Sequence, residues 1–182
     1  FYAVAPSLYA DLACFGTAVF FSEEIPGERR IADAVRPLSE ICIAENAWGD
    51  VDTVYRRFSL SARNAFEMFG ERLSDKVRRQ VDKAPDSRVF FIHAVAPNAA
   101  YEPGAMAERG KPFLSLYLEE EGETEVARGG YYEMPYQCPR WAQGSGEAWG
   151  RGLGELALAD VKMLNRMDET AIRAAQKIAD PP

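Results

Sequence analysis

The chain has 182 residues, the size of one domain or of one domain with an attached lobe. Hydrophobic residues make up 47% and charged residues 27%, a globular composition that excludes a disordered or collagen-like chain. The formal net charge of -7 excludes a protein that binds nucleic acid through bulk positive charge.

No segment of the sequence predicts a membrane helix. The longest nearly unbroken apolar run, residues 89–95, is far shorter than the roughly 20 residues that a bilayer helix needs. No signal peptide is visible, because Phe1 opens directly into an amphipathic pattern. The chain starts without Met and stops abruptly at Asp180-Pro181-Pro182, so we expect a fragment of a longer protein.

The N-terminal part of the chain predicts one helix followed by short strands. Ser7 is a candidate N-cap for a helix that Gly16 ends, with apolar residues at i, i+4 and i+7: Leu8, Leu12 and Phe15. Runs rich in Val, Ile, Phe and Tyr then predict strands at residues 17–25, 31–36, 39–45 and 51–58. Turn sequences separate these strands: Pro26-Gly27, Pro37 and Trp48-Gly49-Asp50.

Two short helices are predicted next. Ser61 opens the first and Gly70 closes it, and a second helix follows Ser74 and ends at Pro85. Both show apolar residues at helical spacing. In the first these are Ala62, Ala65, Phe66 and Phe69, and in the second Leu73, Val77 and Val81.

The middle of the chain predicts two further strands and a turn. Residues 89–95 are apolar almost throughout, which favours a strand covered on both faces. Three leucines at positions 114, 116 and 118 alternate with Ser115 and Tyr117, the pattern of a half-buried strand. Five glutamates surround Gly122 in residues 119–125, and we interpret them as a solvated turn rather than as a metal or acid/base site.

The residue types that usually carry catalysis are sparse. His93 is the sole histidine and lies inside an apolar strand, and no G-x-S-x-G motif accompanies it, so we expect a core or sheet-surface histidine. The cysteines lie far apart, which argues against a disulfide framework or a metal site and favours a reducing compartment: Cys14, Cys42 and Cys138. We therefore expect no catalytic, cofactor-binding or metal-binding residue.

A glycine-rich segment precedes the last helix. It reads Gly144-Ser-Gly146-Glu-Ala-Trp-Gly150-Arg-Gly152-Leu-Gly154. Glycines before a helix can bind phosphate through backbone N–H groups, so a nucleotide-binding or small-molecule enzyme domain that uses Gly144 to Gly154 is the alternative hypothesis. Neither G-x-G-x-x-G nor G-K-[ST] is present. The other interpretation is a loop that needs positive φ angles and close backbone approach between neighbouring subunits or lobes.

Residues 155–178 form the longest helical pattern, roughly 36 Å if continuous. Its apolar stripe consists of Ala157, Val161, Leu164, Ala171, Ala175 and Ile178, widened by Met163 and Met167. Its basic residues are Lys162, Arg166, Arg173 and Lys177. We expect that these four cannot all share one helix face, that each adjacent pair acts separately, and that Glu169 pairs with Arg173 at i, i+4.

The order of motifs resembles the bacteriophage head-to-tail connecting protein family, the portal proteins of short-tailed phages. In that family an aromatic-Gly-Arg loop precedes a Leu-x-Asp-x-x-x-Leu-Asn helix, matched here by Trp149-Gly150-Arg151 and by Leu158 to Asn165. The N-terminal half matches in order at residues 7–12, 15–17, 43–45, 49–54 with Arg57, and 69–70. Gly152-Leu153 departs from the family, which often has Ser or Gly followed by Pro.

The resemblance implies an α+β fold with three parts. Residues 1–138 would form a portal-like wing of short antiparallel strands and helices, residues 139–154 a connecting loop, and residues 155–182 a candidate stem helix. It also implies a structural loop built by Trp149, Gly150, Arg151 and Asn165. The DNA-channel candidates are Lys162, Arg166, Arg173 and Lys177, of which we expect one pair to face the channel.

The function implied is structural. A ring, usually of about twelve subunits, would occupy one vertex of the capsid in the virion and pass double-stranded DNA during packaging and ejection. Its partners would be other copies of itself, the DNA, a terminase motor, capsid or scaffold proteins and tail adaptors, with assembly in the bacterial cytoplasm and a phage or prophage origin. No membrane and no cofactor are implied. A capsid-associated scaffold or adaptor without a channel is a third hypothesis.

Overall fold

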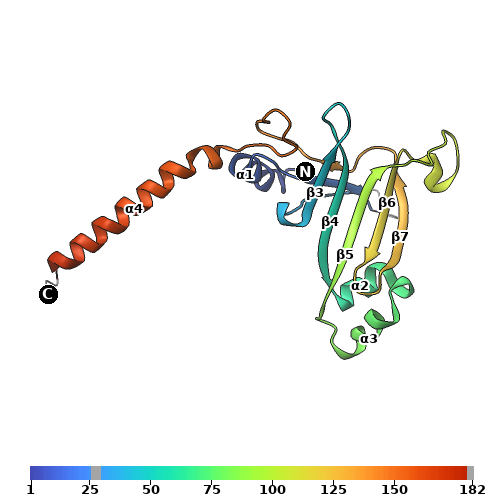
Figure 1. The fold of residues 1–182 in the computed structure, drawn as a ribbon. Coiled ribbons are helices and arrows are strands. Elements are labelled where there is room, and N and C mark those ends of the chain that lie inside the picture. The colour runs from blue at the N-terminus through green and yellow to red at the C-terminus, as the bar shows by residue number, and fades with distance from the viewer. Residues whose placement is uncertain (26–29, 180–182) are drawn as a thin grey trace. The chain divides into compact units, whose positions relative to one another are not determined.

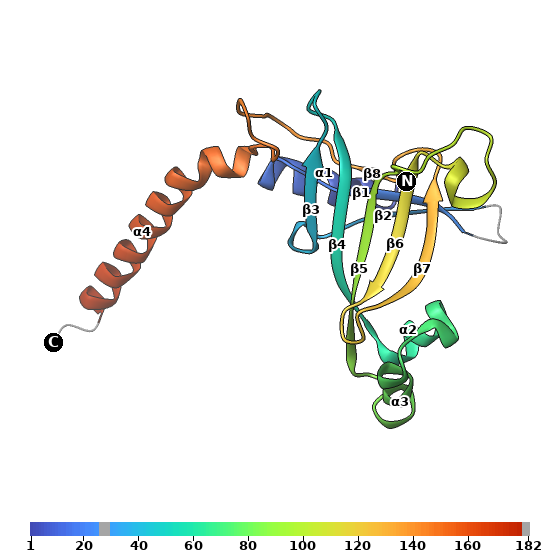
Figure 2. The same ribbon diagram turned by 45° about the vertical axis from the view of Figure 1, so that its right-hand side comes forward.

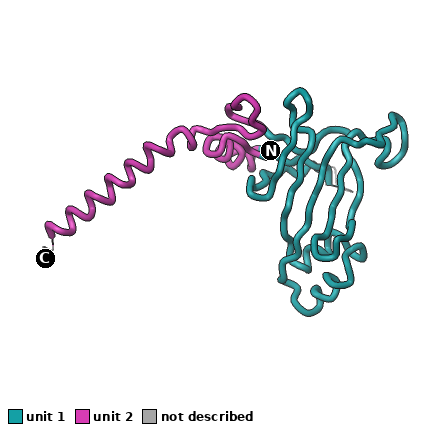
Figure 3. The backbone as a smooth tube through the Cα atoms, viewed as in Figure 1, with its two compact units in different colours: residues 1, 19–138 teal, residues 2–18, 139–182 magenta. Residues whose placement is uncertain are grey.

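The computed structural model describes residues 1–25 and 30–179. It has an α+β fold with antiparallel sheets and a long C-terminal helix, which confirms the predicted class. The chain divides into two compact units, residues 1 and 19–138, and residues 2–18 and 139–182 (Figure 3). The predicted turn at Pro26-Gly27 and the predicted stop at Asp180 to Pro182 lie outside the described residues.

The first unit contains two antiparallel sheets (Figures 1 and 2). The larger has the order β3-β4-β5-β6-β7, with bounds Ile41–Glu45, Val51–Ser61, Arg88–Pro97, Phe113–Glu119 and Thr124–Tyr131. The smaller has the order β2-β1-β8, with β1 at Phe20–Glu24, β2 at Ile31–Val35 and β8 at Tyr136–Gln137. The strands predicted from the sequence are therefore present, with shifted ends.

Helices α2 (Ala62–Phe69) and α3 (Asp75–Lys83) lie at one end of the larger sheet (Figures 1 and 2). Both predicted caps are confirmed, since Ser61 Oγ accepts from the Asn64 N–H at 3.3 Å and Ser74 Oγ from the Val77 N–H at 3.4 Å. Short 3-10 turns lie at Leu38–Glu40, Gly70–Arg72 and Ala107–Gly110.

One face of β5 connects the two hydrophobic clusters of the first unit. Val89 and Phe91 belong to the cluster formed with α2 and α3, and Val95 belongs to the cluster formed with the smaller sheet. Phe90, Ile92 and Ala94, on the other face, are only partly buried. The expectation of a strand covered on both faces is therefore wrong, because the alternate residues of β5 are not fully enclosed.

The buried positions of β6 are polar. Ser115 and Glu119 are buried, whereas Leu114, Leu116 and Leu118 are only partly buried. The reason is the register: Ser115 pairs with Val95 and Glu119 with Phe91, so both point to the buried face of β5. Leucine alternation in the sequence therefore marks the outer, half-exposed face.

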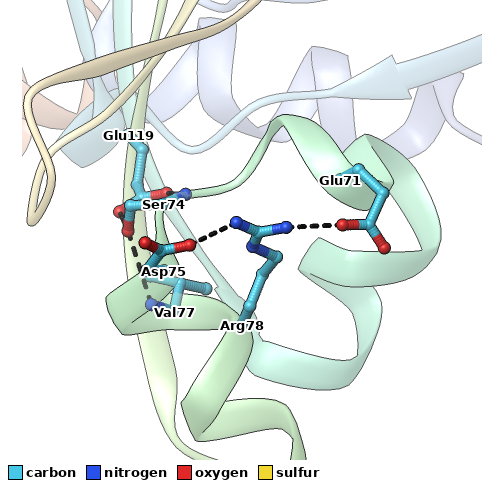
Figure 4. Close-up of polar contacts among 6 residues, drawn as sticks. All are labelled: Glu71, Ser74, Asp75, Val77, Arg78 and Glu119. Carbon is cyan, nitrogen blue, oxygen red and sulfur yellow. Dashed lines mark hydrogen bonds and ion pairs between the residues drawn. The ribbon is translucent and has the colours of Figure 1, made fainter.

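Glu119 anchors the start of α3 instead of lying in a solvated turn (Figure 4). Its side chain is 0% exposed and accepts hydrogen bonds from the Ser74 N–H at 2.9 Å and the Ser74 Oγ–H at 2.5 Å. The interpretation of residues 119–125 as a wholly solvated turn is thus wrong at this position. A charged acceptor at a helix N-terminus is favourable, because the first backbone N–H groups lack helical partners.

We expect Glu119→Ala to lower the free energy of unfolding by about 3 kcal/mol, because two hydrogen bonds to a buried charge are lost. Glu121→Ala is the matched control, since the exposed pair between Glu121 and Lys76 at 2.9 Å should contribute less than about 1 kcal/mol. Urea unfolding of the three proteins measures both values. Equal effects of the two substitutions would contradict this role for Glu119.

His93 is a core histidine, which confirms the expectation for it. The residue is 1% exposed, and its ring stacks on Tyr117 with centroids 3.9 Å apart. Its Nδ1 lies 2.8 Å from the Tyr136 hydroxyl and its Nε2 lies 3.0 Å from the Ser115 hydroxyl. Both ring nitrogens therefore have neutral partners, an arrangement that holds the ring in place between the two hydrophobic clusters.

The pKa of His93 is lowered from 6.5 to about 3, chiefly by burial and also by the positive charges of Arg56 and Arg36. The neutral form is thus the native one at physiological pH. Because the unfolded chain takes up a proton near pH 6.5 and the native state does not, stability from this group is complete above that pH and is lost as the pH falls toward 3.

We expect His93→Gln to flatten the acid side of the stability profile. The difference in unfolding free energy between wild type and variant should be largest at pH 7 and should shrink by up to about 1.4 kcal/mol per pH unit below pH 6.5. Urea titrations at several pH values between 7 and 4.5 measure this difference. A difference that stays constant over that range would show that His93 titrates normally in the native protein.

Candidate functional site: the glycine-rich loop and the long helix

The second unit begins with α1 (Ala5–Phe15). The predicted cap at Ser7 is wrong, because the helix begins after Val4, without a side-chain cap, and has a proline in its first turn. The predicted end is confirmed: Gly16 has φ 77° and its N–H donates to the Leu12 carbonyl at 3.0 Å.

The glycine-rich loop packs its backbone against the C-terminal end of α1. A Cβ atom at Gly150 would lie 2.1 Å from the Gly16 carbonyl oxygen, and one at Gly152 would lie 2.5 Å from the Gly16 nitrogen. At Gly154 it would lie 2.5 Å from the Cys14 carbonyl oxygen. Close backbone approach therefore explains these glycines, and the segment they approach belongs to the same chain.

Two backbone donors at the centre of this loop are already bonded within the protein. The Gly150 N–H donates to the Thr17 hydroxyl at 2.8 Å, and the Arg151 N–H donates to the Ala142 carbonyl at 2.6 Å. A phosphate site would need such N–H groups to point at the ligand. Nothing in this geometry supports the alternative of a nucleotide site at Gly144 to Gly154.

The residues predicted as a structural loop lie in two places. Trp149, Gly150 and Arg151 are in the loop, where Trp149 is 40% exposed and the Arg151 guanidinium pairs with Glu147 at 2.5 Å. Asn165 lies on the long helix, about 18 Å along its axis from Leu153. The structure thus brings Gly150 and Arg151 against the end of α1 and leaves Asn165 outside the loop.

Helix α4 (Leu153–Ala179) has 27 residues and contains no buried residue. Its large apolar side chains are exposed, for example Leu156 at 72%, Met167 at 59% and Ile172 at 59%. Ordinary amphipathic helices bury such residues against a core. An exposed apolar helix surface of this length is typical of surfaces that contact a partner.

The four basic residues of α4 share one side of the helix. Each residue advances the helix by about 100°, so positions i, i+4, i+11 and i+15 fall within about 60° of each other. Lys162, Arg166, Arg173 and Lys177 have this spacing. The expectation that they cannot share a face is therefore wrong, because the seven-residue step from Arg166 to Arg173 returns nearly to the same direction.

The opposite side of α4 is mainly apolar, although Asp160 and Asp168 also lie on it. By the same rotation, these apolar or small residues lie at least about 60° away from each of the four basic residues: Val161, Leu164, Met167, Ile178, Ala157, Ala171, Ala174 and Ala175. Arg173 pairs with Glu169 at 2.6 Å, as the i, i+4 spacing predicts. Lys162 and Arg166 form no ion pair with the residues that the structure describes.

Neither a metal centre nor a membrane helix is found in residues 1–25 and 30–179. Within that part of the chain, no three His, Cys, Asp or Glu side chains are grouped so as to hold a metal ion. Over the same residues, no helix has the length and apolar character needed to cross a bilayer.

The whole chain, residues 1–182, matches the bacteriophage head to tail connecting protein family, and the chain belongs to that family. It is 28% identical over 186 residues to the portal protein of Salmonella phage epsilon15. It is 30% identical over 186 residues to the probable portal protein of Bordetella phage BPP-1. Both alignments cover 100% of this chain and 33% of the relative, so the chain spans about a third of the length of these curated relatives.

We expect Gly152→Ala to destabilise the second unit by about 1–3 kcal/mol, because its Cβ would meet backbone atoms of Cys14 and Gly16 that cannot move cheaply. Gly129→Ala is the control, since a Cβ there meets nothing within 4 Å. Hydrogen exchange of the α1 amides, with thermal unfolding, measures the effect. Unchanged α1 protection in Gly152→Ala would contradict the close packing.

Proposed function

We propose that this chain is part of a phage portal subunit, which forms a ring at the capsid vertex through which double-stranded DNA is packaged and ejected. Family membership and the two portal relatives support this role. The single observation that carries it is α4, a long helix with an exposed apolar face and a basic stripe on the opposite side.

The apolar face of α4 suits a neighbouring copy of the same chain. A closed ring of identical subunits uses two different patches on each subunit, so each copy must expose surface that a neighbour covers. The four alanines of this face allow close approach between helices. In this role α4 acts as a stem helix, the first unit forms the wing, and the ring contains about twelve subunits.

The basic stripe suits a channel lining. With the apolar face against neighbours, the opposite side would face the lumen and the DNA phosphates. Because Arg173 is paired with Glu169, we propose that Lys162 and Arg166 are the pair that meets DNA. The net charge of -7 on the chain limits total phosphate affinity, so the duplex can slide through the ring.

The role proposed is structural and non-enzymatic. Terminase, capsid or scaffold proteins and tail adaptors would dock on the assembled ring in the virion. Trp149, Gly150 and Arg151 would form the structural loop that precedes α4. Asn165 would belong to the same structural element, on the helix that follows the loop.

Electron microscopy of the full-length protein tests this proposal, alone and with the double substitution Lys162→Gln and Arg166→Gln. We expect both proteins to form closed rings, because the substituted side chains lie off the apolar face. DNA retention should be altered in the variant, and the salt dependence of DNA binding should weaken by about 0.9 in slope for each cation removed.

The control is Glu169→Gln with Arg173→Gln, which removes an ion pair without changing the net charge. It should leave both the ring and the salt slope unchanged. A wild-type protein that stays monomeric at every concentration contradicts the portal role. Loss of the ring in the Lys162 and Arg166 variant would instead place this pair at the subunit interface.

A further inference from the structure

The first unit contains a pocket of about 210 Å³ that the proposed channel role does not use. Its walls come from both sheets and include the rings of Phe21, Phe58 and Tyr117. Two guanidinium groups also line it: Arg36, directly after β2, and Arg56 on β4. The pocket thus combines aromatic walls with two positive charges.

Arg36 has a buried donor with no acceptor. Among the described residues, its Nε is the one buried side-chain nitrogen or oxygen that lacks a hydrogen-bond partner. Its guanidinium lies over the Phe21 ring at 5.0 Å, a contact that fixes the group without satisfying its N–H groups. A buried donor without an acceptor is unfavourable, so the site is suited to an incoming acceptor.

The second guanidinium is already neutralised. Arg56 Nε and Nη2 both lie 2.8 Å from Glu40 Oε2, and the group sits over Phe58 at 4.4 Å. The remaining carboxylate on the wall, Glu23, accepts the Tyr131 hydroxyl at 2.7 Å.

The Arg36 guanidinium forms no direct ion pair within the described residues, although the carboxylate of Glu40, which bonds Arg56, also favours its charged form. Burial lowers the pKa of Arg36, and repulsion by Arg56 lowers it further. The guanidinium nevertheless stays charged, because arginine is protonated over the whole physiological range. A negative group in the pocket would relieve both the desolvation and the repulsion.

We propose that this pocket binds a carboxylate group, held by the Arg36 guanidinium. The planar fork of arginine matches two carboxylate oxygens, and the aromatic walls suit a planar, weakly hydrated ion. The volume is below the about 300–1,000 Å³ typical of cofactor sites, so the pocket accepts a side-chain carboxylate or a small organic acid but no nucleotide.

The carboxylate has two possible sources, a free acid or an Asp or Glu side chain of a second copy of this chain. All residues that line the pocket belong to the first unit, so carboxylate binding there does not depend on the channel role of α4.

The test uses the full-length protein and sodium succinate as the probe, with sodium chloride at equal ionic strength as the reference. Arg36→Gln is compared with Arg57→Gln, which removes the same charge one residue from Arg56 but from an exposed pair with Glu120 at 2.9 Å. Calorimetric titration measures succinate binding, and sedimentation measures self-association. Circular dichroism checks the fold of each variant, and Arg36→Lys keeps the charge without the fork.

For a free acid, we expect succinate to bind wild type and Arg57→Gln equally and to bind Arg36→Gln at least about tenfold more weakly, with self-association unchanged. If the carboxylate comes from a second copy, we expect Arg36→Gln to weaken self-association about tenfold or more. We then also expect succinate to weaken the self-association of wild type, because it competes for the same pocket. In either case, the affinity measured for Arg36→Lys should lie between that of wild type and that of Arg36→Gln. If neither succinate binding nor self-association depends on Arg36, the pocket binds no carboxylate and the proposal is overturned.

Discussion

Backbone contact between the glycine-rich loop and the end of α1 determines where α4 begins. Gly150 and Gly152 bring the loop to within van der Waals distance of Gly16, and Gly154 continues the contact in the first turn of α4. At Gly154, the second residue of α4, a Cβ atom would lie 2.5 Å from the Cys14 carbonyl oxygen, so the close contact there requires glycine. Within the second unit, backbone packing therefore constrains the residue type at the point where α4 starts.

Elements whose signal is local in the sequence are predicted well. The caps at Ser61 and Ser74 and the helix end at Gly16 are confirmed, because each depends on backbone groups within four residues. The burial of Glu119 is not predictable in this way. It follows from the pairing of β6 with β5, which turns the polar residues of the alternating pattern inward.

In the candidate site, too, features that depend on neighbouring residues can be predicted from the sequence, and features that depend on tertiary contacts cannot. The length of α4 and the Glu169 to Arg173 pair follow from spacing alone. The common side of the four basic residues also follows from their spacing, because the seven-residue step from Arg166 to Arg173 returns nearly to the same direction. The spacing of the loop glycines indicates close backbone approach, but it does not identify α1 as the segment they approach, because α1 lies more than a hundred positions earlier in the sequence. The unpartnered Arg36 donor is likewise invisible before the two sheets are assembled.

The charge pattern of α4 fits a surface that touches DNA without retaining it. Glu155 and Glu169 lie seven residues on either side of Lys162, so by the helical rotation they point to the same side as the basic residues. Four cations and two anions then share this side, and the surplus of positive charge is small. Each phosphate contact releases counterions and adds to affinity, so a mixed surface binds weakly and exchanges contacts readily. In the proposed ring this balance would let DNA move in both directions, while the apolar face supplies the energy of assembly.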